Sequence, residues 1–149
     1  MTDPTASSPA PSSSAASWFG VTEEHERIMR LALAEAQRAI EHGDVPVGAL
    51  VFRGDELIAS RHHERELTGD PPAHAEVLAL RDAAERPGRW RLDACTLVVT
   101  LEPGVVCAGA LLNSRIQTLV YGAADMKAGG CLSLYQLCDD PRLNHRVET

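Results

Sequence analysis

The chain has 149 residues and a formal net charge of −7 at pH 7. This length suffices for one domain with its own hydrophobic core. The composition, 44% hydrophobic and 23% charged residues, is that of an ordinary globular protein. No apolar run approaches the roughly 18–20 residues that a membrane span needs. The negative charge argues against unspecific affinity for nucleic acid, which requires many Lys and Arg side chains, but it leaves room for a shaped site with a local basic rim.

The cysteines show no spacing typical of a disulfide framework, and no signal peptide is evident, so we expect a reducing cytoplasm. Four cysteines occur, Cys95, Cys107, Cys131 and Cys138. Cys95 and Cys138 are interpreted as buried, inert thiols. Residues 1–21 open with a Ser-, Ala- and Pro-rich stretch, which predicts a disordered tail. The folded domain is expected over residues 22–149.

The first expected element is a helix that begins at Thr22, a suitable N-cap, and ends at His42-Gly43. Acidic residues follow the cap, and apolar residues recur at helical spacing. Next, strands over residues 49–52 and 57–60 are joined by a turn, which predicts a hairpin. A polar loop is expected over residues 61–72.

The second half of the chain alternates helices with strands. A helix is expected from about Ala73, then a buried central strand over residues 95–101, because that run is continuously apolar. A helix over 105–114, a strand over 119–121 and a short helix over 132–137 follow. The order β-β-α-β-α-β after an N-terminal helix predicts an α/β fold with a mixed sheet and helices on both faces.

Two segments carry a metal-site signature in which one ligand is missing. His74 and Glu76 form an H-x-E pair, and a later segment runs from Pro103 through Gly104 to Cys107. The pattern H-x-E followed by P-C-x-x-C is the signature of zinc nucleobase deaminases. Gly104 stands where that pattern has its first cysteine. Alone, either half is common and unspecific; together, at the starts of two expected helices, they are much more specific.

The chemistry explains why these residue types occur at helix starts. A helix N-terminus favours a thiolate over a thiol, which would lower the pKa of a cysteine there. Cysteines at i and i+3 share one helix face, and a histidine from another helix start completes three ligands with a fourth position for water. Zinc lowers the pKa of that water. Glu76 would then move the proton to the departing amine as general base and acid.

The chain resembles bacterial tRNA-specific adenosine deaminases over roughly residues 23–148. The matching segments, besides the signature, are His25-Glu26, Met29-Arg30, Ala32-Leu33, Val45-Pro46-Val47-Gly48-Ala49, Val99-Thr100-Leu101-Glu102-Pro103, Cys107-Ala108-Gly109-Ala110, Ser114-Arg115-Ile116, Tyr121-Gly122-Ala123 and Asn144-His145-Arg146-Val147-Glu148. The resemblance implies a cytidine-deaminase-like three-layer α/β/α fold, a homodimer and one Zn²⁺ per protomer. It also implies hydrolysis of the anticodon wobble adenosine to inosine in arginine tRNA.

The resemblance also implies roles for individual residues. His74 and Cys107 correspond to zinc ligands, with Gly104 at the third-ligand position, and Glu76 corresponds to the proton shuttle. The substrate-facing positions are Val47 and Ala73 in the base pocket, His63, and Asp125 in a loop that approaches the substrate strand.

Three departures from the family bear on activity. Gly104 has no side chain to coordinate a metal, and losing one ligand would weaken zinc binding by roughly 10²–10⁴; Cys131 is a candidate substitute. His63 stands where the family usually has a substrate-binding asparagine, and it is either a substrate contact or an exposed loop residue. Relatives continue beyond Thr149 through a strand and a C-terminal helix, so we expect a truncated C-terminus with apolar surface uncovered.

Three hypotheses therefore stand. The chain is an active tRNA adenosine deaminase that tolerates Gly104, or a deaminase-fold protein that is catalytically inactive (a pseudoenzyme, variant or fragment), or a deaminase of free nucleobases. We favour the family assignment and expect little activity from the chain as written.

Overall fold

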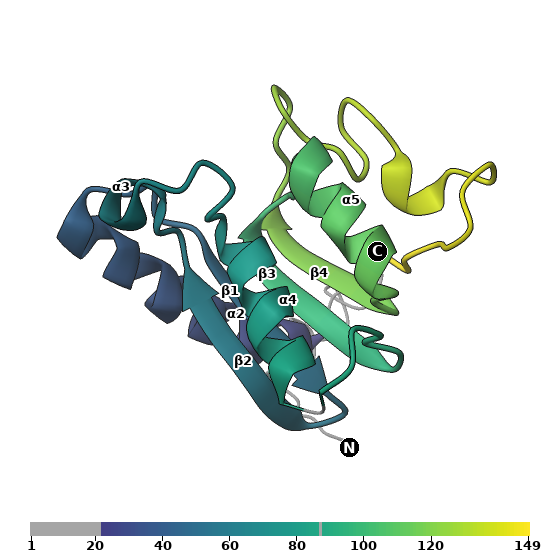
Figure 1. Cartoon of the computed structure of the whole chain (residues 1–149), viewed down its shortest axis with the longest axis horizontal. Coiled ribbons are helices and arrows are strands. Elements are labelled where there is room, and N and C mark those ends of the chain that lie inside the picture. Colours follow the sequence, from purple (N-terminus) through teal and green to yellow (C-terminus); the bar gives the residue numbers. More distant parts are fainter. Residues whose placement is uncertain (1–21, 87) are drawn as a thin grey trace, which may run out of the picture.

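The computed structural model describes residues 22–86 and 88–149 (Figure 1). The expected disordered tail over residues 1–21 lies outside the described residues. Within them, four strands form one sheet in the order β2-β1-β3-β4. The strands are β1 (Gly48–Arg53), β2 (Glu56–His62), β3 (Cys95–Leu101) and β4 (Thr118–Ala123). Strand β1 is antiparallel to β2 and β3, whereas β3 and β4 are parallel, which confirms the predicted mixed sheet.

Helices cover both faces of this sheet (Figure 1). Helix α2 (Glu23–Gln37) lies on one face, and α4 (Ala75–Glu85) and α5 (Val105–Ser114) lie on the other. Successive side chains along each strand point to opposite faces of the sheet, so each strand contributes to both layers of the core. The α2 side buries Ile28, Ala32, Leu50, Phe52 and Val98. The α4/α5 side contains Ala49, Val51, Ala79, Leu97, Val99, Ala108 and Leu111. The three-layer α/β/α architecture is thus confirmed.

Helix α2 begins as the sequence predicts. The Thr22 hydroxyl accepts the His25 N–H at 3.1 Å, and His25 Nδ1 accepts the Thr22 N–H at 3.2 Å, so two otherwise unpaired donors are satisfied. The helix continues as a 3₁₀ segment, η1 (Arg38–His42), and ends at Gly43, whose φ of 79° is left-handed. The expected end is correct, but the last five residues are wound as a 3₁₀ helix.

The loop expected over residues 61–72 is only partly a loop. Strand β2 extends to His62, and a short helix, α3 (Arg65–Thr68), follows. The cause is Asp44, whose carboxylate accepts the N–H groups of Glu66 at 2.8 Å and Leu67 at 3.3 Å. A distant residue therefore caps this helix, which local sequence does not indicate.

The helix expected over residues 132–137 is wrong. The later N–H groups do not donate to carbonyls four residues earlier, as a helix requires: those of Leu134 and Tyr135 both donate to the Gly129 carbonyl, and that of Leu137 donates to the Gly130 carbonyl. Residues 131–134 form turns, and only a short 3₁₀ segment, η2 (Leu137–Asp139), follows.

The last described residues begin to pair beside β4. Glu148 makes an isolated parallel bridge with Thr118, and its carbonyl accepts the Leu119 N–H at 2.7 Å. A hollow of about 930 Å³ lies along this side of β4, and its lining includes Tyr121 and Val147. Among residues 22–86 and 88–149, no helix has the length and apolar character needed to cross a membrane.

Candidate functional site

The two signature segments meet at the starts of α4 and α5. His74 is the N-cap residue of α4, and Glu76 lies in the first turn with its side chain turned into the protein, 4% exposed. Strand β3 leads through Gly104, the N-cap residue of α5, to the buried Cys107 in that helix's first turn. Helix α4 contacts α5, and the Glu76 carboxylate lies near enough to the Cys107 thiol for its charge to act on that thiol. The two helix starts therefore approach each other, but Cys107 is not part of the group of donor atoms that His63, His74 and Glu76 form among the described residues.

Burial governs the electrostatics of this pair. It raises the pKa of Glu76 to about 7, although interactions with the backbone of Glu76 itself and with Cys107 act in the opposite direction. Burial, and then the charge of Glu76, raise the pKa of the Cys107 thiol far above its ordinary value. The sequence predicted a lowered cysteine pKa at a helix N-terminus. That prediction is wrong for the Cys107 thiol without a bound metal, because desolvation and the neighbouring Glu76 carboxylate outweigh the effect of the helix dipole on its pKa.

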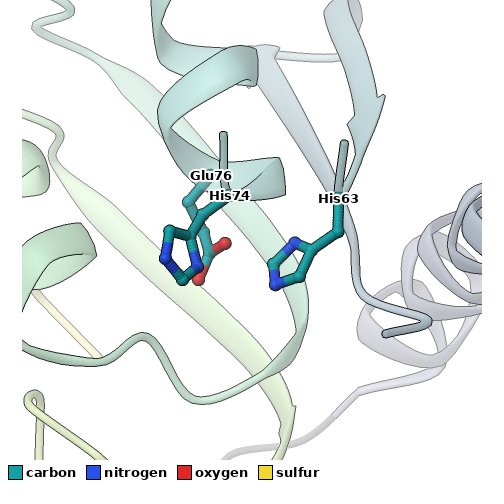
Figure 2. Close-up of side chains that lie close together, drawn as sticks. All are labelled: His63, His74 and Glu76. Atoms are coloured by element: carbon teal, nitrogen blue, oxygen red, sulfur yellow. The ribbon is translucent and has the colours of Figure 1, made fainter. Parts of the chain in front are cut away.

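His63 belongs to the same site. It follows β2, is only 7% exposed, and its ring meets the His74 ring edge-on at 5.0 Å between centroids. Its Nδ1 accepts the N–H of Ala75, the first residue of α4, at 2.9 Å. Figure 2 shows the His74 imidazole beside the Glu76 carboxylate, with His63 facing them. The interpretation of His63 as an exposed loop residue is wrong, because a buried helix N–H holds its ring at the site.

The donor atoms of His63, His74 and Glu76 lie within 4.8 Å of one another. Burial, followed by the charge of His74, lowers the pKa of His63 to about 4. Burial also lowers the pKa of His74. Both imidazoles are therefore neutral near pH 7, which is the protonation state in which histidine offers a lone pair to a metal or a proton to an acceptor.

The four residues assigned to the substrate differ in position. Val47 and Ala73 are both buried and flank His63: the Val47 carbonyl accepts the His63 N–H at 3.2 Å, and Ala73 directly precedes His74. Asp125 lies in the loop after β4, outside the His63–His74–Glu76 cluster, and its carboxylate accepts the N–H groups of Lys127 and Ala128. The structure therefore brings three of the four together.

The residues present do not supply the three-ligand set of the signature. Gly104 contributes no donor, although its φ of −77° suits any L-residue. A Cβ added there would lie 3.3 Å from the carbonyl oxygen of Ala128, so a side chain needs a shift of a few tenths of an ångström. Cys131, the candidate substitute, is buried with its Sγ 3.2 Å from Cys138 Sγ. It is not part of the cluster of donor atoms that the described residues form.

Glu102 is a buried residue that supports the site, and the sequence alone does not indicate this role. It is 2% exposed, and its carboxylate accepts the backbone N–H groups of Asp125, Leu132 and Ser133 and the Ser133 hydroxyl. Burial alone would raise its pKa, but these hydrogen bonds lower it to about 2. Glu102 therefore holds the loops after β4 against the Pro103-Gly104 turn. A buried acid just before a proline at a strand end was the available signal.

Comparisons with known proteins identify the family of the chain. The MafB19-like deaminase family model matches residues 23–149. A tRNA-specific adenosine deaminase of Aquifex aeolicus is 45% identical to this chain, over 83% of this chain and 82% of the relative. The tRNA-specific adenosine deaminase of Bacillus subtilis is 42% identical, over 84% of this chain and 78% of the relative.

Solved structures give the same result. A tRNA A34 deaminase, described for A-to-I editing at the wobble position, superposes with a TM-score of 0.79 at 37% identity, over 83% of this chain and 89% of that one. A guanine deaminase from Bacillus subtilis superposes with a TM-score of 0.65 at 33% identity, over 67% of this chain and 64% of the guanine deaminase. The chain therefore belongs to the family of tRNA-specific adenosine deaminases.

Proposed function

We propose that this chain acts on a tRNA anticodon loop in the cytoplasm, as a homodimer, and that its reaction is hydrolysis of the wobble adenosine to inosine with release of ammonia. The relatives named above support the reaction and the substrate class; arginine tRNA is the first substrate to test. The observation that carries the proposal is the buried Glu76 carboxyl beside His74 and His63, near enough to Cys107 for its charge to raise the pKa of that thiol.

The roles of the residues follow from their positions. Glu76 is a buried carboxyl with a pKa near neutrality, so it is suited to take a proton from water and deliver it to the departing amine. Val47 and Ala73, which are small, apolar and buried, would line the base pocket. His63, with Nδ1 occupied by the Ala75 N–H, presents its other nitrogen as a hydrogen-bond donor for the base. Asp125 would contact the substrate strand from the loop beyond β4.

We further propose that Gly104 impairs this reaction. The signature's zinc set is incomplete, and removal of one ligand is expected to weaken zinc binding by roughly 10²–10⁴. The sharpest test compares the chain with its Gly104→Cys variant on an arginine-tRNA anticodon stem-loop, with inosine measured by mass spectrometry. Glu76→Gln in the Gly104→Cys background serves as the inactive control. Equal rates for the chain and Gly104→Cys would contradict the proposed impairment.

Two alternatives are separated by the same experiment. If Gly104→Cys gains zinc but forms no inosine, the cause lies in the substrate contacts, of which His63 is the first to test. If ammonia is released from free guanine or adenine but not from the stem-loop, the guanine deaminase among the structural neighbours is the better guide. Sedimentation showing only monomer at micromolar concentration would contradict the proposed dimer.

A further inference from the structure

Two free thiols outside the candidate site lie against each other. The Sγ atoms of Cys131 and Cys138 are 3.2 Å apart, and the two residues are buried, 3% and 0% exposed. Neither belongs to the group of donor atoms that His63, His74 and Glu76 form among the described residues. A disulfide bond is about 2.03–2.05 Å long, so the two sulfurs are about 1.2 Å from bonding distance.

The backbone keeps the two cysteines side by side. The Leu137 N–H donates to the Gly130 carbonyl at 3.0 Å, so the residues that directly precede the two cysteines are hydrogen-bonded to each other. The carbonyl of Cys138 in turn accepts the Val147 N–H at 2.8 Å. Because the fold holds both thiols in place, each meets the other at a high effective concentration.

The surroundings of the pair allow oxidation. The hydrogen bond between the thiols lowers the pKa of Cys138 and raises that of Cys131, while burial raises both. One sulfur of the pair is therefore the more readily ionised, and the thiolate is the form that attacks an oxidant. Cys131 borders the hollow of about 930 Å³ beside β4, which gives an oxidant as small as hydrogen peroxide a route to the pair.

We propose that Cys131 and Cys138 are a redox-active dithiol that hydrogen peroxide converts to a disulfide. One thiolate of the pair attacks a peroxide oxygen, the O–O bond breaks, and a sulfenic acid forms as hydroxide leaves. The other thiol attacks the sulfenic sulfur, the S–S bond forms, and water leaves. The hydroxide takes up the proton that the first thiol lost. Two thiols and one peroxide thus give one disulfide and two molecules of water.

The disulfide would close the segment 131–138 beside the Glu102 carboxylate. That carboxylate accepts the N–H groups of Cys131 at 3.2 Å and of Asp125 at 3.1 Å, so the disulfide and the loop that carries Asp125 share one anchor. Closing a short loop restricts the unfolded chain, and the melting temperature is expected to rise by about 5–10 °C. In a reducing compartment the pair remains a dithiol until peroxide accumulates. The inference does not depend on the proposed reaction with tRNA.

The test exposes the reduced full chain to hydrogen peroxide without denaturant. Catalase then removes the peroxide, iodoacetamide in guanidinium blocks the remaining thiols, and trypsin digests the chain. Cleavage after Lys127 and Arg142 leaves both thiols of the pair in one peptide. Mass spectrometry of that peptide is expected to show the loss of two hydrogens and no alkyl group. Chymotrypsin should then cut after Tyr135 without separating the halves, whereas Cys95 and Cys107 should be alkylated in the same sample.

Single substitutions supply the controls. Cys131→Ser and Cys138→Ser should each abolish the disulfide and the rise in melting temperature, whereas Cys95→Ala should still form the disulfide. Dithiothreitol added to the native oxidised chain should restore the starting melting temperature. Thermal unfolding of each reduced variant shows whether it folds, and alanine replaces serine where it does not.

Two results would overturn the inference. A peptide 128–142 that stays doubly alkylated, with the disulfide formed only when guanidinium is present during oxidation, would show that the thiols only fill space. A disulfide from either thiol to Cys95 or Cys107 would show a different pairing. Neither result measures inosine, so both leave the proposed function standing. Conversely, a chain that forms the disulfide but never deaminates RNA, even as Gly104→Cys, would contradict the function and not this pair.

Discussion

Glu102 gives the most quantitative prediction that the structure supports. Its pKa falls from an ordinary 4.5 to about 2 because the hydrogen bonds it accepts outweigh the effect of burial. A difference of about 2.5 pKa units, at 1.36 kcal/mol each, corresponds to about 3 kcal/mol of stability. Solvent near the loops that Glu102 holds screens part of this interaction, so the value is an upper bound. Glu102→Gln should therefore lower the free energy of unfolding at pH 7 by about 1–3 kcal/mol.

The sign of the pH dependence makes this prediction specific. Because the folded pKa is lowered, the stabilisation is fully present above pH 4.5 and is lost as the pH falls towards 2. Urea unfolding of the chain and of Glu102→Gln at pH 7, 4.5 and 3 should show a difference that shrinks with acid. Glu85→Gln, which removes an exposed carboxylate, is the matched control and should change stability by less than about 0.5 kcal/mol. A Glu102→Gln effect that is constant with pH would refute the reasoning.

Three further predictions concern packing and helix ends. Gly48→Ala should destabilise the fold by about 1–3 kcal/mol or more, because the added Cβ would press against the carbonyl oxygen of Ala32 in α2. Gly109→Ala should stabilise α5 by about 0.5–1 kcal/mol, because the space around the added Cβ is open. Opposite shifts in melting temperature test this pair. Leu97→Ala should cost about 2–5 kcal/mol in urea unfolding, since the side chain is fully buried. Thr22→Ala should cost about 0.5–2 kcal/mol and lower helicity by circular dichroism, and an unchanged value would show that the cap does not matter.

The elements that the sequence predicted well are those whose signals are local. The run 95–101 is apolar throughout and became the central strand β3 with unchanged bounds, and residues 105–114 became α5. Both depend on burial patterns carried within the segment. The failures came from partners outside the segment: Asp44 accepts N–H groups of the first turn of α3, and the Gly129 and Gly130 carbonyls accept the N–H groups of Leu134, Tyr135 and Leu137 in place of helical partners.

The same division applies to the site. Spacing and residue type correctly predicted that the segments around Glu76 and Cys107 would meet. The protonation behaviour of Cys107 was not predictable, because it depends on how deeply its thiol is buried beside a carboxylate, and only tertiary packing sets that depth. The burial of His63 likewise depends on the Ala75 N–H, which lies on another element.

The segment that bears Gly104 keeps its conformation through hydrogen bonds of its own. The Pro103 carbonyl accepts the Gly130 N–H at 2.8 Å, and the Gly104 carbonyl accepts the Ala108 N–H at 2.8 Å. Glu102 fixes the adjoining loop from the other side. None of these contacts involves a side chain at position 104, so the turn and the start of α5 form with glycine there. A glycine in place of a cysteine ligand is therefore expected to act on metal binding rather than on the backbone around it.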